Sequence, residues 1–136
     1  MDITDNDENC SILSDIIQKR SFCTNIYHLN ISGRCRLKIQ HIKDLSQSFT
    51  NLQTLKFPMK FDLSYNEQLD IISQFILIQM RNYLHYLHIY FEQENLLIMS
   101  MTPSESQLSE WLGHNQKRLM HIQAIELNRN QLSVWM

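Results

Sequence analysis

The stretch Ser21–Ile31 (SFCTNIYHLNI) is repeated in outline by Ser48–Phe57 (SFTNLQTLKF). Each contains a Thr-Asn pair, then an aliphatic residue, then a leucine three positions later and another apolar residue two positions after that. The first aliphatic residues of the two copies, Ile26 and Leu52, lie 26 positions apart. Because strand side chains alternate between two faces, the end of each copy is predicted to be a short strand with its apolar residues on one face.

Two weaker copies follow at less regular intervals, in Asn82–Ile89 and in Ile122–Asn130. Repeats of about 20–29 residues around an LxxLxL core are typical of leucine-rich repeats, which stack because one unit cannot bury its apolar face by itself. We therefore predict an α/β fold, a short irregular leucine-rich-repeat-like array of about four parallel strands with intervening helices. A generic α/β or α+β domain is the alternative. The residues expected to point into the core are Leu29, Ile31, Leu55, Phe57, Leu87 and Ile89.

The segments between the copies predict helices. In Leu69–Met80, apolar residues recur every three or four positions, and Asn66 is a suitable N-cap. Thr102-Pro103-Ser104-Glu105 is a capping box that should open another helix, closed by Gly113. Shorter helices are predicted at Ile12–Lys19, capped by Ser11, and at Ile39–Phe49.

Composition also suggests where the folded domain begins. Residues 1–10 hold four carboxylates and few apolar side chains, which predicts a disordered acidic N-terminus. The remaining residues, 11–136, are predicted to form a single leucine-rich-repeat-like domain. Within it, Pro58 is expected to end the second strand, because proline cannot donate a hydrogen bond to a strand ladder.

The C-terminal segment Ile122–Met136 allows two interpretations. Asn128–Gln131 separates two β-prone runs, so the segment is either a last repeat or a hairpin. We interpret Trp135 as a core or cap residue, with a role as an interface anchor as the alternative. The alternating residues that would cover the last apolar edge are Leu132, Val134 and Met136.

Composition argues against several classes of partner. A chain of 136 residues with 43% apolar residues suits one domain with a sizeable core. Its 12 basic and 14 acidic residues give a net charge of −2 without a strong basic cluster, so no nucleic acid is expected as a partner. The longest apolar runs are far shorter than the roughly 20 residues that span a bilayer, so no membrane is expected either. Three cysteines without a CxxC pair, and no secretory signal, are typical of a cytoplasmic or nuclear protein.

No catalytic or ligand-binding motif is present. The chain has only two glycines, which argues against glycine-rich phosphate loops. His85 and His88 form an HxxH pair, but strand residues three apart point to opposite faces, so we interpret them as exposed histidines and not as zinc ligands. Cys23 occupies the place that Phe49 has in the second copy, which favours packing over a nucleophilic role. We therefore expect no enzymatic activity, no cofactor and no metal.

The stretch Phe22–Met136 resembles the leucine-rich-repeat portion of F-box proteins, the substrate receptors of cullin–RING ubiquitin ligases. The resemblance is carried by Thr24-Asn25-Ile26, by Thr50-Asn51-Leu52 and by the Leu84, Leu87 and Ile89 spacing. In that family the repeats hold the substrate, and a separate N-terminal F-box docks the ligase. The first 20 residues carry no F-box, since they hold no Leu-Pro start and only one short helical stretch. What the resemblance implies here is protein recognition in the ubiquitin pathway, without the docking part.

In such an array, strand residues that point away from the core line a continuous concave surface. Tyrosines beside polar groups suit protein recognition, because a tyrosine buries a large area at a small cost in entropy. We predict that these residues contact a partner protein, the alternative being that they are ordinary solvent-facing residues. The predicted protein-binding residues are His28, Asn30, Thr54, Lys56, Tyr86, His88, Tyr90 and Glu126.

These patterns lead to one prediction of function and one alternative. The prediction is a non-enzymatic protein-interaction module, which the resemblance narrows to the substrate-recognition part of a ubiquitin-ligase-type receptor. The alternative is a structural or capping fragment of a larger repeat array with no binding activity of its own. Such a fragment would expose an open edge and self-associate.

Overall fold

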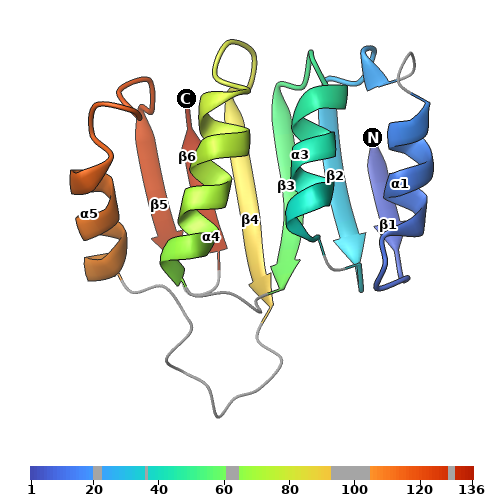
Figure 1. Cartoon of the computed structure of the whole chain (residues 1–136), viewed down its shortest axis with the longest axis horizontal. Helices are drawn as coiled ribbons and strands as arrows, with labels where there is room; N and C mark the ends of the chain where they lie inside the picture. Colours follow the sequence, from blue (N-terminus) through green and yellow to red (C-terminus); the bar gives the residue numbers. More distant parts are fainter. Residues whose placement is uncertain (20–22, 36, 61–64, 93–104, 129–130) are drawn as a thin grey trace.

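A computed structural model describes residues 1–19, 23–35, 37–60, 65–92, 105–128 and 131–136. One mixed six-stranded sheet carries the described helices on one of its faces (Figure 1). The predicted α/β class is thus confirmed. The strands are β1 (Asp2–Asp5), β2 (His28–Gly33), β3 (Thr54–Lys60), β4 (Tyr86–Glu92), β5 (Ala124–Asn128) and β6 (Gln131–Trp135). The helices are α1 (Ser11–Gln18), α3 (Ile39–Ser48), α4 (Tyr65–Ile72), which continues as the π-helical η1 (Ser73–Ile78), and α5 (Glu105–His114).

The first four strands lie side by side in chain order and run parallel, within the sheet order β1-β2-β3-β4-β6-β5. The helices α1, α3 and α4, which connect them, all lie on the same face of the sheet (Figure 1). In the paired strands, Leu29 lies opposite Leu55, and Leu55 lies opposite Leu87. The leucines that share a place in the sequence pattern are therefore neighbours in space.

The core lies between the sheet and the helices. The six residues predicted to point inward are at most 1% exposed. The first aliphatic residues of the first three copies, Ile26, Leu52 and Leu84, are buried as well. The helices contribute Leu13, Ile42, Leu45, Leu69, Ile72, Ile76 and Leu108 to the same cluster. Removal of this apolar surface from water is the main favourable term in the folding of such a domain.

The predicted helices are present, with differences at their ends. The segments predicted at Ile12–Lys19, Ile39–Phe49 and Leu69–Met80 correspond to α1, α3 and the continuous α4 and η1. Asn66 lies inside α4 instead of capping it. The helix predicted from the capping box is α5, which runs one residue past Gly113, whereas residues 102–104 of the box lie outside the described residues.

The predicted disorder of residues 1–10 is wrong, because this segment contains β1. β1 pairs in parallel with β2, with Ile3 opposite Ile31, and Ile3 is buried in the core. The folded domain therefore also includes residues that precede residue 11, namely those of β1. The acidic composition was misleading because some of these carboxylates bind backbone N–H groups, as Asp7 Oδ1 does with the N–H of Asn9 at 3.0 Å.

Asp5, at the end of β1, organises the start of α1. It is fully buried, and its Oδ2 accepts the N–H of Ile12 at 3.0 Å, while its Oδ1 accepts the N–H of Asp7 at 3.0 Å. The predicted cap, Ser11, is instead the first residue of the helix, and the N-cap position belongs to Cys10, which makes no side-chain cap. A carboxylate from the preceding strand thus binds one of the N–H groups that a helix start leaves without a partner.

Gly33, which lies opposite Asp5 in the β1–β2 pair, should not tolerate a side chain. Its φ is +100°, and a Cβ atom would lie 2.5 Å from the backbone oxygen of Asp5. Gly33→Ala is expected to lower the free energy of unfolding, measured in urea, by about 2 kcal/mol. Gly113→Ala is the control, since nothing lies within 4 Å of that added Cβ, and it should stabilise α5 slightly. Equal stability of the two variants would contradict the close approach of β1 to Gly33.

Strand β3 continues through Pro58, where the sequence predicted its end. The N–H of Thr54 donates to the carbonyl of Tyr27, on the side of β2, and alternate residues of a strand direct their N–H groups the same way. The backbone nitrogen of Pro58 therefore also points toward β2. Because the β2–β3 pairing ends at Asn30 and Lys56, the missing N–H of Pro58 costs no ladder hydrogen bond.

The C-terminal segment forms the hairpin that was one of the two predicted alternatives. β5 and β6 pair antiparallel, and β6 also pairs antiparallel with β4, so that Val134 lies opposite Leu87. The fourth parallel strand expected at Ile122–Leu127 is therefore wrong, and the sheet is mixed. β6 begins only three positions after β5 ends, and a parallel connection needs a crossover of about a dozen or more residues.

Candidate binding face of the sheet

We call the sheet face opposite the helices the open face. It is made by the strand residues that alternate with the buried ones. All eight residues predicted to bind a protein lie on it, and β6 adds Ser133 and Trp135 to them. The open face is thus defined by His28, Asn30, Thr54, Lys56, Tyr86, His88, Tyr90, Ser133, Trp135 and Glu126, together with Asp2 of β1.

One row of the open face crosses all six strands. In the order of the sheet, this row consists of Asp2, Asn30, Lys56, His88, Ser133 and Glu126. Neighbouring strands lie about 4.8 Å apart, so Lys56 and His88 are direct neighbours in the middle of the sheet. Asp2 and Glu126, by contrast, lie on the two edge strands. Glu126 was predicted to extend the row of parallel strands, and β6 separates it from them.

A second row contains His28, Thr54, Tyr86 and Trp135. His28 Nδ1 and Thr54 Oγ1 are 2.8 Å apart, which joins β2 to β3 by a side-chain hydrogen bond. The rings of Tyr86 and Trp135 lie 5.4 Å apart across the β4–β6 pair. The row therefore changes from polar to aromatic along the sheet.

His88 is the centre of a hydrogen-bonded cluster between these rows. Its Nδ1 lies 2.8 Å from Ser133 Oγ and 3.1 Å from the hydroxyl of Tyr86. The ring of Tyr90 packs edge-on against the His88 ring, with 4.4 Å between the centroids. These neighbours leave His88 only 8% exposed although no described helix covers this face.

The other ring nitrogen of His88, Nε2, is buried and makes no hydrogen bond with the described residues. Burial lowers the pKa of His88, and the positive charge of Lys56 lowers it further. Both effects favour the neutral form of the ring. Buried polar atoms in folded proteins nearly always have a hydrogen-bond partner, so Nε2 of His88 is an exception to this rule.

Lowering the pH should destabilise the protein through His88. Its native pKa lies below the ordinary 6.5, so as pH falls the unfolded chain takes up the proton first. The contribution of His88 is complete above about pH 6.5 and is lost as pH falls through the native pKa. We expect the urea midpoint to decrease between pH 7.5 and pH 5, and His88→Gln to reduce this decrease. A residual decrease is expected from His41, whose pKa is lowered by burial and then by Lys38. An unaltered pH profile in His88→Gln would rule out this role of His88.

Sequence reasoning missed Ser133 and Trp135 as members of the face. Trp135 was interpreted as a core or cap residue, yet it is 37% exposed and contacts Tyr86 on the open face. A signal was available, because the alternation of Leu132 and Val134 toward the core places the residues between and after them outward. What could not be read from the pattern was that β6 lies next to β4.

A hollow of about 180 Å³ lies beside the cluster, over the first three strands. Lys56 borders both the hollow and the cluster, since its Nζ lies 6.0 Å from the centroid of the Tyr86 ring. The residues that line the hollow are Met1, Asp2, His28, Leu29, Asn30, Thr54 and Lys56.

The pair of Ser133 and His88 has the distance of a nucleophile and its base, but a catalytic base is normally oriented by a third group. Nε2 of His88 has no such partner among the described residues. In the part of the chain that the structure describes, no group of three or more His, Cys, Asp or Glu side chains could hold a metal ion. No described helix is long and apolar enough to cross a membrane.

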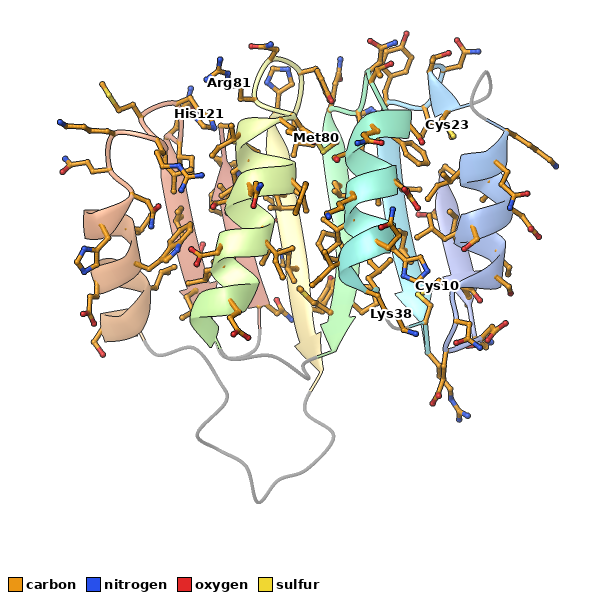
Figure 2. The ribbon with its side chains drawn as sticks, viewed as in Figure 1. Cys10, Cys23, Lys38, Met80, Arg81 and His121 are labelled. Atoms are coloured by element: carbon orange, nitrogen blue, oxygen red, sulfur yellow. The ribbon has the colours of Figure 1, made fainter. Side chains whose placement is uncertain are left out.

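The cysteines lie away from the open face. Figure 2 shows Cys10 and Cys23 at opposite ends of α1 on the helix side of the sheet. All three cysteines are buried thiols. Burial raises the pKa of Cys23, and its Sγ donates to the carbonyl of Ile16 at 3.3 Å. A raised pKa disfavours the thiolate that a nucleophile requires.

The helix side has its own ordered contacts at the upper edge of the sheet in Figure 2, where Met80, Arg81 and His121 are labelled. His121 Nε2 lies 2.7 Å from the carbonyl oxygen of Leu77, which joins the segment before β5 to the end of η1. Met80 is fully buried. These contacts serve packing, and the concentration of half-exposed aromatic and polar residues remains on the open face.

Comparison with known proteins adds no assignment: no family model matches the chain, and no match was found among the curated proteins or the solved structures.

Proposed function

We propose that the chain is a non-enzymatic module that binds a partner protein through the open face. The observation that supports this most is the group of aromatic side chains on a face that no described helix covers, with Tyr90 40% and Trp135 37% exposed. Tyrosine and tryptophan are the residues that most often dominate protein–protein binding energy. Their hydroxyl and indole groups also supply hydrogen bonds at the rim of an otherwise apolar contact.

The parallel part of the sheet further supports the proposal of a leucine-rich-repeat-like array. Leu29, Leu55 and Leu87 share both a sequence position and a row of the sheet. Asn51 Nδ2 donates to the carbonyl of Thr24 at 2.8 Å, so a residue of the second copy binds the first copy. Bonds of this kind between equivalent segments are what stacked repeats need, because each unit contacts only its neighbours.

A narrower proposal comes from the sequence resemblance. It holds that the chain is the substrate-recognition part of a ubiquitin-ligase-type receptor in the cytoplasm or nucleus. The test is whether a protein bound by the open face becomes ubiquitylated in cells only when this chain is present. Unchanged ubiquitylation of that protein after removal of the chain would remove the ubiquitin pathway from the proposal and leave protein binding.

Site-specific photocrosslinking would test the binding face. A photoreactive amino acid at Glu126, on the open face, should cross-link a discrete partner in cell extract. The same group at Gln47, exposed on α3, should not. Once a partner is identified, Tyr90→Ala combined with Trp135→Ala should weaken its binding at least about tenfold, as expected when central aromatic residues are removed.

Tyr27→Ala is the matched control for this experiment, because Tyr27 is 49% exposed but precedes β2 and lies outside the open face. Its affinity for the partner should equal that of the wild type. Equal cross-linking from Gln47 and Glu126, or full affinity of the double variant, would place the binding surface elsewhere.

A structural role is the second candidate, favoured by the antiparallel β5–β6 hairpin, which ends the row of parallel strands. A piece that only completes a larger array would use β1 or β5, the two edges of the sheet, to associate. Sedimentation analysis over a range of concentrations distinguishes the two candidates. A monomer supports the binding module, whereas association that survives the Tyr90→Ala and Trp135→Ala changes supports the structural role.

A further inference from the structure

Lys56 is a cation in the middle of the open face that has no counter-ion among the described residues. Its Nζ lies 6.0 Å from the centroid of the Tyr86 ring, and no carboxylate of the described residues forms an ion pair with it. In its row, the nearest carboxylate positions are Asp2, two strands away, and Glu126, three strands away. Among the described residues, neither carboxylate forms an ion pair with Lys56. The half-buried Lys56 thus has an unused capacity to bind an anion.

His88, the direct neighbour of Lys56 in the row, supplies a second unused group. The hydroxyls of Tyr86 and Ser133 both approach Nδ1. When a hydroxyl donates to Nδ1, the proton of the neutral ring is on Nε2, which then becomes a donor without an acceptor. This tautomer is favoured because the hydroxyl of Tyr86 donates to Ser133 Oγ at 3.4 Å, which leaves the hydroxyl proton of Ser133 for Nδ1. His88 is more than nine-tenths buried, so an incoming acceptor would relieve an unfavourable state of the free protein.

We propose that Lys56 and His88 together bind the carboxylate of an aspartate or glutamate side chain of the partner protein. This inference rests on the proposed function and names the chemistry of the partner. The two oxygens of a carboxylate can accept from two donors at once, which suits an ammonium and an imidazole N–H on adjacent strands. The hollow, which Lys56 lines and His88 does not, gives space for the partner chain on the side of Lys56 that faces β2.

The remaining charges of the face define where the acidic residue fits. Asp2 and Glu126, on the edge strands, repel acidic groups from the two ends of the row, while Lys56 attracts one to the centre. The hollow is also lined by Asp2 and by His28, whose Nδ1 already contacts Thr54 Oγ1. Because Nε2 of His88 is covered, a neighbouring side chain must move on binding. Tyr90, which packs against the ring and is 40% exposed, is the side chain most able to do so.

A displayed library of random 12-residue peptides provides a probe of known composition. The wild-type chain should enrich peptides with Asp or Glu at one fixed position. Lys56→Met should lose that preference and bind the selected peptides about tenfold more weakly, whereas Lys56→Glu should select Lys or Arg at the same position. Thermal unfolding of each variant checks that the fold is kept.

Imidazole NMR of His88 gives a second readout, which a purely structural role would not change. A selected acidic peptide should raise the pKa of His88, since a nearby negative charge favours the protonated ring. The same peptide with its acidic residue changed to Gln or Asn should leave the titration unchanged. A His88 titration that is insensitive to the acidic peptide would overturn the pairing of Lys56 with His88.

The outcomes of the selection separate this inference from the proposed function. Peptides that need Tyr90 and Trp135 but carry no fixed acidic residue would overturn the carboxylate site and leave the open face as a binding surface. Enrichment that no open-face substitution affects, or no enrichment at all, would overturn both. A fixed acidic position that follows the charge of residue 56 would support both.

Discussion

Replacing Asp5 by alanine is expected to lower the free energy of unfolding by about 3 kcal/mol, because it removes a buried acceptor from several backbone donors at once. The carboxylate accepts the N–H groups of Ile12 and Asp7 at 3.0 Å each, and that of Leu13 at 3.5 Å. In the variant these groups would be left without this acceptor close to the core. The carboxylate also lies at the start of α1, where a negative charge interacts favourably with the helix dipole. Urea unfolding followed by circular dichroism measures the change.

Two variants separate this role of Asp5 from a general effect of charge. Asp5→Asn keeps one oxygen acceptor, so its loss of stability should lie between that of the wild type and that of Asp5→Ala. Asp15→Ala removes an exposed carboxylate from the same helix and should change stability by less than about 0.5 kcal/mol. Faster hydrogen exchange at the amides of Ile12 and Asp7 in Asp5→Ala would locate the effect. Equal stability of Asp5→Ala and Asp15→Ala would contradict a capping role for Asp5.

Asp5 also explains why the N-terminal strand could not be predicted. A strand of four residues carries little periodic signal, and in β1 only Ile3 provides an apolar side chain for the core. The adjacent carboxylates lower the hydrophobicity of the segment, which is the usual signature of disorder. Asp5 accepts hydrogen bonds from the backbone N–H groups of Ile12 and Asp7, which come later in the chain. These bonds form only because the loop between β1 and α1 brings the groups back to the carboxylate. Composition does not encode that geometry.

The central part of the fold was accessible because its signal is local and repeated. The spacing of Leu29 and Ile31, and of Leu55 and Phe57, predicted which residues are buried, and the copies correspond to neighbouring strands. Consecutive helical connections on one face place such copies side by side without further information. The C-terminal hairpin differs, because the position of β6 between β4 and β5 is a property of the whole sheet.

The same distinction applies to the candidate site. Strand alternation was sufficient to place Lys56 and His88 on the face away from the helices. The burial of His88 and its bond to Ser133 depend on β6, which follows His88 by more than 40 residues in the chain. Exposure to solvent was therefore the natural expectation for His88, and it was wrong. The burial of His88 and its contact with Ser133 arise from the position of β6 beside β4, which the sequence around His88 does not predict.

Phe57→Ala is expected to lower the free energy of unfolding by about 4 kcal/mol, which is more than the loss expected for Asp5→Ala or Gly33→Ala. Phe57 is fully buried, lies opposite Ile89 in the β3–β4 pair and is among the largest side chains of the core. Truncation removes its transfer free energy and leaves a cavity that the surrounding helices and strands can fill only in part. Phe57→Leu, which keeps much of the volume, should cost about 1 kcal/mol.

Lys56→Ala, one position earlier on the same strand, is the sharpest comparison for Phe57→Ala. Strand alternation places Lys56 on the open face, so its truncation should cost less than about 1 kcal/mol in stability. The two substitutions should therefore differ in what they change. Phe57→Ala should lower stability, and Lys56→Ala should weaken the binding of an acidic partner. A large loss of stability in Lys56→Ala with little change in Phe57→Ala would mean that β3 presents the opposite face to the helices. The buried row of leucines and the proposed binding face would then exchange places, because a shift of one residue in a strand moves every side chain to the other side of the sheet.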